Sequence, residues 1–435
     1  MKINDLKHEQ LQEFYACAGK FGHDIAALRA GEEMCSYITI PTLQEAGRIL
    51  THLNEEQRKA RAANFFNTAV AARRRLGQGV HDRGEASVIT GSDLSEHDLQ
   101  GLSNHLPLRA KVVSVLHKTV RAGEVWDISV RGEVWGLDDR EELYVGLNIG
   151  TLVLEPGACV AVQGNVLSLL CQKVVAIAPA NTAHSYWEQP HIAILPTPFS
   201  VDFSEGPLNG EPGQAGENGE NGLDGKPLRL AQSLLGKRLQ QPLHEADLDG
   251  IPGTDGGPGQ AGTKGRNGGM SKLADVILRS VEGLLLIFGK AGQGGAGGHG
   301  GQGGVGGYGG NGTAGAKIVA GLITGGQGGV GGNGGSGGNG GNGGNGGIAS
   351  NIFLIVPPGD EAKIKGLALP SEPGSGGNGG KGGLGGNGGR GGDGPDAQHG
   401  GVSGSSGQTG APGLPGRPGR GRPAPAIFLN EILLT

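Results

Sequence analysis

The sequence predicts a multidomain protein: an N-terminal α-helical region, an all-β middle domain, and a C-terminal layered bundle of six polyglycine-II helices stapled by apolar β-strands. Glycine is distributed unevenly, with 16 of the 92 glycines in residues 1–205 and the other 76 in residues 206–435. Apolar residues follow a helical spacing early in the chain and a β spacing after residue 106. We therefore expect domains at 1–105, 106–205 and 206–435.

The first domain carries helix start and stop signals. We expect a helix over Leu6–Ala18 that ends at Gly19, and a helix start at Pro41-Thr42, where Glu45 completes a capping box. A longer helix is expected over Glu55–Leu76, with apolar residues at helical spacing. Such a small helical unit suits attachment or oligomerisation, and its residues do not specify which.

The middle domain has short apolar runs separated by Gly, Pro and Asp turns. A sandwich and a short solenoid fit these runs equally well. Cys159 and Cys171 lie in this stretch, either as a disulfide pair or as two buried thiols. The expected strands are 111–116, 124–130, 143–154, 158–162, 166–170 and 174–177.

Beyond residue 206 the glycines fall into six runs with a three-residue period. We call these runs glycine segments 1 to 6. Segments 1, 2 and 6 have one glycine per triplet, whereas segments 3, 4 and 5 have two. In order, their glycine registers cover 210–225, 250–268, 294–310, 325–347, 376–392 and 401–419.

A three-residue period places each triplet position on one face of a rod without internal hydrogen bonds. A glycine face lets a neighbouring backbone approach closely enough to supply those bonds. Collagen and a flexible linker are alternatives, but the runs are short for collagen, and a linker does not need strict register. We therefore expect segments 1, 2 and 6 at the edges of an intrachain bundle and segments 3, 4 and 5 between neighbours.

These six registers resemble those of the polyglycine-II bundle proteins, which include the snow-flea glycine-rich antifreeze protein, phage tail-fibre adhesins and the N-terminal domain of Obg GTPases. The resemblance covers about residues 206–420. It implies rods packed in layers by backbone hydrogen bonds. It does not imply one activity, because these relatives have unrelated functions.

Apolar runs between the segments are expected to form strands that hold the rods. Glu282-Gly283 is a candidate two-residue hairpin turn between Val276–Val281 and Leu284–Phe288. A membrane-inserting hairpin is the alternative interpretation of that pair. The other expected strands are 317–323, 351–356, 363–369 and 426–434.

In the paired-glycine segments only the third residue of each triplet is expected to face outward, in straight rows. Such rows could bind a repetitive partner or could be merely solvated. The connectors 226–249 and 348–373 are further candidate contact loops. The candidate binding residues in the rows are His299, Tyr308, Asn333, Asn339, Asn342, Asn345, Asn378 and Asn387.

The sequence contains no constellation that indicates catalysis. We expect no enzyme activity, no cofactor and no metal site, and the net charge of −5 gives no reason to expect nucleic acid. We expect a non-enzymatic, adhesin-like scaffold that presents polar ladders and loops to a cell surface, glycan or protein; it could be oligomeric.

A secreted effector or toxin that acts on membranes with its apolar strands is the alternative function, and ice binding is a further one. A membrane is therefore a possible partner, although it is not favoured. No classical signal peptide or transmembrane helix is apparent. The expected location is therefore cytoplasmic, virion-associated, or reached by a signal-independent export route.

Overall fold

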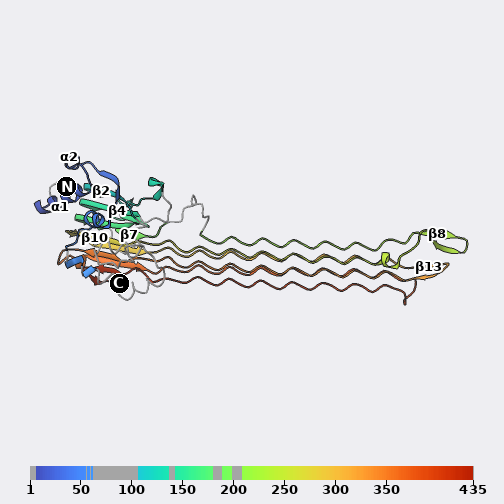
Figure 1. Ribbon diagram of the computed structural model, residues 1–435. Helices are drawn as coiled ribbons and strands as arrows, with labels where there is room; N and C mark the ends of the chain where they lie inside the picture. Colours follow the sequence, from blue (N-terminus) through green and yellow to red (C-terminus); the bar gives the residue numbers. More distant parts are fainter. Residues whose placement is uncertain are drawn as a thin grey trace.

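The computed structural model describes residues 6–54, 56–58, 60–61, 106–136, 143–179, 189–197 and 208–434. These residues form a head of strands and short helices at one end of an elongated molecule (Figure 1). The glycine segments project from this head side by side, and we call them together the stalk. The hairpins that contain β8 and β13 lie at the far end of the stalk (Figure 1).

Short helices cover part of the head. The side chain of Asp24 caps the second helix by accepting from the N–H of Ala26, and Thr42 caps the third by accepting from the N–H of Glu45. The predicted start at Pro41-Thr42 is thus confirmed. Of the predicted helix 55–76, residues 56–58 and 60–61 are helical, and 62–76 lie outside the described residues. The described helices are α1 (His8–Lys20), α2 (Ile25–Arg29), α3 (Leu43–Leu50), and the 3-10 helices η1 (Gly132–Trp135), η2 (Glu245–Leu248) and η3 (Glu361–Lys363).

Two sheets build the head. The nine-stranded main sheet has the order β1-β2-β4-β6-β10-β15-β17-β18, with β11 also paired to β6, and the second sheet has the order β16-β12-β7-β5-β3. The main sheet consists of β1 (Met34–Ile40), β2 (Leu108–Val120), β4 (Leu143–Leu154), β6 (Val166–Ala176), β10 (Ala274–Leu278), β11 (Val281–Glu282), β15 (Ile352–Ile355), β17 (Ile427–Leu429) and β18 (Ile432–Leu433). The second sheet consists of β3 (Val125–Asp127), β5 (Cys159–Gln163), β7 (Ile192–Leu195), β12 (Leu285–Lys290) and β16 (Ile364–Leu369).

From β2 onward the chain passes back and forth between the two sheets, and most neighbouring strands are parallel. One hydrophobic core lies between the sheets, and a second lies between the other face of the main sheet and the N-terminal helices. Burial on both faces explains why β4 and β10 are almost continuously apolar rather than alternating.

The predicted fold class is wrong. Among the described residues, most regular structure is strand, largely in one large mixed sheet, and helices are few. This arrangement conflicts with a helical region, an all-β middle domain and a bundle of polyglycine-II helices. Strands β1, β2, β4, β6, β10, β11, β15, β17 and β18 join the same sheet although they are distant in sequence, and all their pairings except β1–β2 and β17–β18 are parallel.

The stalk consists of extended glycine segments that leave the head and return in pairs (Figure 1). Segments 1, 3 and 5 lead away from the sheets, and segments 2, 4 and 6 lead back to them. Backbone bonds join different segments at a three-residue interval. For example, the Gly300 N–H donates to the Asn378 carbonyl and the Gly301 N–H donates to the Gln260 carbonyl, each at 2.8 Å. Segments 3 and 4 each exchange such bonds with four others.

Close contact between the backbones of neighbouring segments explains why glycine occupies the inner positions of the stalk. A Cβ added at Gly335 in segment 4 would lie 1.9 Å from the Gly257 carbonyl oxygen of segment 2, whereas one at Gly400 would meet nothing closer than 3.6 Å. Real side chains do not tolerate the first of these distances. The inner positions of the stalk therefore exclude any side chain.

Two local predictions are also corrected. Gly283, with φ +84°, carries the chain from the main sheet to the second sheet, so the strands around it do not form a hairpin with each other. The run 317–323 is not in the head but forms a hairpin at the far end of the stalk. Cys159 and Cys171 are buried free thiols.

Candidate functional site

The predicted polar rows are on the surface of the stalk but are divided among three segments. Seven of the eight candidate residues are exposed, and Asn345 is half-buried. His299 and Tyr308 lie on segment 3, the asparagines between 333 and 345 on segment 4, and Asn378 and Asn387 on segment 5. The structure therefore does not gather these residues into one cluster.

Several of these side chains accept hydrogen bonds from the stalk itself. The Oδ1 atoms of Asn339 and Asn342 accept from the backbone N–H groups of Leu414 and Arg417, each at 2.8 Å. Asn333 and Asn345 do the same for Gln408 and Arg420, and His299 accepts from the Asn378 N–H. These side chains join segment 4 to segment 6 and segment 3 to segment 5. Among the described contacts, the side-chain amides of Asn378 and Asn387 make no hydrogen bond.

The far end of the stalk is a second candidate site, formed by two short hairpins. The hairpin β8–β9 turns at Leu234-Leu235, which are 106% and 76% exposed. The hairpin β13–β14 turns at Val319-Ala320, and Val319 is also exposed. The strands are β8 (Leu230–Ser233), β9 (Gly236–Leu239), β13 (Ala316–Ile318) and β14 (Gly321–Ile323). We call these two hairpins the tip.

The two hairpins of the tip contact each other. The N–H of Val319 donates to the Lys237 carbonyl at 3.0 Å. A cavity of about 550 Å³ lies between the hairpins, and Leu235, Lys237, Lys317 and Val319 are among the residues that line it. The tip therefore combines exposed apolar turns with cations beside a shared hollow.

The two predicted contact loops lie at opposite ends of the molecule (Figure 1). The connector 226–249 contains the β8–β9 hairpin at the tip, whereas 348–373 returns to the head as β15, η3 and β16. The β8–β9 hairpin was not predicted. Its signal in the sequence is Gly236, which directly follows the turn and has φ +125°, a backbone conformation that favours glycine.

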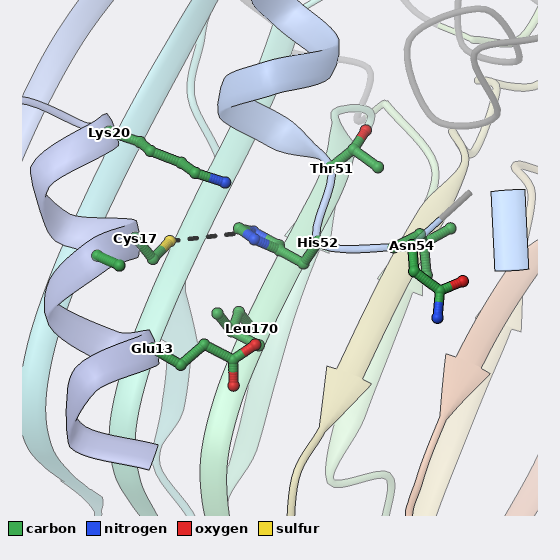
Figure 2. Close-up of a pocket in the computed structure, with 9 residues that line it drawn as sticks. Glu13, Cys17, Lys20, Thr51, His52, Asn54 and Leu170 are labelled. Carbon is green, nitrogen blue, oxygen red and sulfur yellow. Dashed lines mark hydrogen bonds between the residues drawn. The ribbon is translucent and has the colours of Figure 1, made fainter. Parts of the chain in front are cut away.

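The head contains a third candidate, a cavity of about 240 Å³ between α1 and the segment after α3 (Figure 2). Cys17 and Lys20 on α1 reach toward it from one side, and His52 and Asn54 from the other. The Cys17 Sγ and His52 Nε2 atoms are 4.0 Å apart. Glu13 at its edge accepts hydrogen bonds from the Arg279 guanidinium at 2.5 and 2.9 Å.

The electrostatics of this cavity do not favour nucleophilic catalysis. Burial raises the pKa of Cys17 to about 12 and lowers the pKa of His52 to about 4. Both groups are therefore neutral at pH 7, and a thiol that holds its proton is a poor nucleophile. Burial opposes ionisation of Glu13, but the bonds and charge of Arg279 outweigh it and hold the pKa of that carboxyl below its usual range.

Within the described ranges there is no group of three or more His, Cys, Asp or Glu residues arranged to hold a metal ion. No helix among these residues is both long enough and apolar enough to cross a membrane. Comparison of the chain with protein-family models, curated proteins and solved structures finds no match in any of the three. The candidate sites are therefore judged on their geometry.

Proposed function

We propose that this protein is a non-enzymatic recognition protein. Its head is the attachment end, and its stalk presents the tip to a cell surface. The observation that carries this proposal is the position of the tip, whose exposed hairpins lie at the opposite end of the molecule from α1 and β17 (Figure 1). Exposed apolar residues that are grouped at one place on a protein surface are typical of an interaction site.

The length of the stalk supports this role. The chain advances 26 residues from Lys290 at the end of β12 to Ala316 at the start of β13. An extended chain of that length spans at most roughly 90 Å. Bonds between segments at three-residue intervals restrict bending along this distance. The tip is thereby held well away from whatever the head is attached to.

The alternative functions have less support. A membrane-active effector that uses Val276–Val281 and Leu284–Phe288 would have to extract β10 and most of β12 from the core of the head, where they are buried. Ice binding would need a flat row of small side chains. The exposed rows carry Asn, Lys and Arg, and several of the asparagines bond to neighbouring segments.

The experiment compares binding of the fluorescently labelled full chain with that of a tip variant. The probes are intact bacterial cells and a printed glycan array. The variant Leu234→Asn with Leu235→Asn removes the apolar turn and substitutes a residue that turns favour. Its matched control, Leu384→Asn with Leu414→Asn, changes two exposed leucines on the side of the stalk.

The proposal predicts binding to at least one of these surfaces that the tip variant loses and the control keeps. Binding that is equal for all three proteins would contradict it. Absence of binding to every cell type and glycan would also count against a recognition role.

A further inference from the structure

The turn of the β8–β9 hairpin has an unusual composition. Hairpin turns favour Gly, Asn, Asp and Ser, because these residues tolerate the turn backbone and are well hydrated. Here two leucines occupy the turn, and both are exposed to solvent. The neighbouring hairpin repeats the arrangement with Val319-Ala320 before Gly321, which has φ +140°. Leu234 and Leu235 do not stabilise their hairpin by burial, so their apolar character needs another explanation.

Cations surround these apolar turns. The four charged side chains between 229 and 240 and between 316 and 323 are all basic and exposed, and these stretches contain no Asp or Glu. The nearest acidic residues along the chain are Asp224 and Glu245. The turn after glycine segment 5 carries Asp393 and Asp396 on either side of Pro395, which also lines the cavity, and Asp396 pairs with His399. The basic residues of the tip are Arg229, Lys237, Arg238 and Lys317.

The two hairpins present these features as one unit. A Cβ added at Gly236 would meet the Val319 side chain at 3.3 Å, and the backbone bond from Val319 to Lys237 fixes the hairpins side by side. Lys237 and Lys317 come from different hairpins but line the same cavity, next to Leu235. An anionic group in this cavity would therefore lie beside both lysines and next to the apolar turns.

We propose that the tip docks on an anionic lipid bilayer. Leu234 and Leu235 enter the boundary between headgroups and acyl chains, and the four cations bind lipid phosphates. This inference rests on the proposed function and specifies what the tip recognises. In an anionic bilayer, the negatively charged headgroups and the apolar acyl chains lie within one side-chain length of each other. A neutral glycan offers neither feature, and the four exposed cations carried by the two hairpins favour an anionic surface.

The test is flotation of the full-length protein with vesicles in about 0.1 M salt. One set contains about 30% phosphatidylglycerol in phosphatidylcholine, and the other contains phosphatidylcholine alone. We expect binding to the anionic vesicles that is at least tenfold tighter than binding to the neutral ones. Because each cation near such a surface contributes about fivefold, Lys237→Gln with Lys317→Gln should weaken it by at least about tenfold.

The apolar contribution is tested with Leu234→Asn and Leu235→Asn. This pair should weaken vesicle binding by at least about tenfold, because two leucines no longer leave water. The control pair Leu384→Asn and Leu414→Asn, also exposed but on the stalk, should stay within about twofold of the unaltered protein. Circular dichroism of each variant confirms that it is folded.

Three results would overturn the inference: equal binding to both vesicle types, equal loss in the tip and control variants, or no vesicle binding. In the last case the cell and glycan measurements separate the two proposals. Tip-dependent binding to cells without vesicle binding retains the recognition role and assigns the tip to a protein or glycan. No binding to vesicles, cells or glycans removes both proposals.

Discussion

Substitution of Gly335 by alanine tests the contact between glycine segments 2 and 4. The new Cβ would lie 1.9 Å from the Gly257 carbonyl oxygen and 2.5 Å from its carbon. Ordinary contacts of this kind are about 3.5 Å. Segments 2 and 4 would therefore have to separate by more than 1 Å at this position, because the obstacle is backbone and cannot rotate away.

Separation of segments 2 and 4 would break the hydrogen bonds that hold segment 4 in place next to Gly335. Gly256 and Gly259 of segment 2 donate to the Asn333 and Ser336 carbonyls of segment 4, each at 2.8 Å. The displaced Gly335 N–H also donates to the Gly304 carbonyl of segment 3 at 2.8 Å. Each contributes about 1 kcal/mol net. Replacing a glycine also restricts the unfolded chain, which stabilises by about 0.4–1 kcal/mol. The net expected loss is about 2–3 kcal/mol of local stability.

Hydrogen-exchange mass spectrometry on peptides that cover 325–347 measures this loss. The expected change is exchange about 30–150-fold faster in the Gly335→Ala protein. Gly400→Ala is the matched control, because its Cβ has room, and it should exchange at the unaltered rate. An effect of Gly335→Ala below about twofold, or an equal effect of both substitutions, would refute the steric account of the stalk.

Further predictions concern the stalk and the head. Asn339→Ala should cost the stalk about 1 kcal/mol in opening free energy by hydrogen exchange, whereas Asn387→Ala, which loses no described bond, should cost nothing measurable. Asp275→Asn should lower the urea unfolding free energy of the head by about 3–5 kcal/mol, because the buried Arg61 guanidinium loses its closest carboxylate partner. The pKa of His52 is lowered to about 4, so the unfolded chain binds the extra proton between pH 6.5 and 4. Stability should therefore fall by about 1–3 kcal/mol as pH drops through that window, and urea titrations of His52→Gln should lack this part of the fall.

Local patterns predicted many elements but not their partners. The run 143–154 forms β4 with the predicted bounds, because continuous apolar character with turn signals at both ends is a strong local signal. The predicted strands 166–170 and 174–177 are instead the single strand β6. Gln172, which lies between the two predicted runs, is fully buried, and its side chain donates to Glu13 on α1. That partner is 159 residues away, so no local pattern could indicate it.

The same limit applies to the candidate sites. Exposure of Asn339 follows from the triplet register, and the structure shows it exposed. Its bond to the Leu414 N–H depends on the register between segments 75 residues apart, which the sequence does not encode locally. In the sequence, the two hairpins of the tip correspond only to part of the connector 226–249 and to the apolar run 317–323. Only folding of the stalk brings 230–239 beside 316–323.

The central claim is that the glycine segments are an ordered stalk held by backbone hydrogen bonds, and hydrogen exchange at single-residue resolution across 294–347 tests it most directly. The account predicts protection of both glycine N–H groups in most triplets of segments 3 and 4, because these groups donate to neighbouring segments at 2.8–2.9 Å. Third-position N–H groups such as those of Gln302 and Val330, which make no described hydrogen bond, should exchange faster than these glycines. Exchange of all these amides at the rate of an unstructured chain would contradict the account.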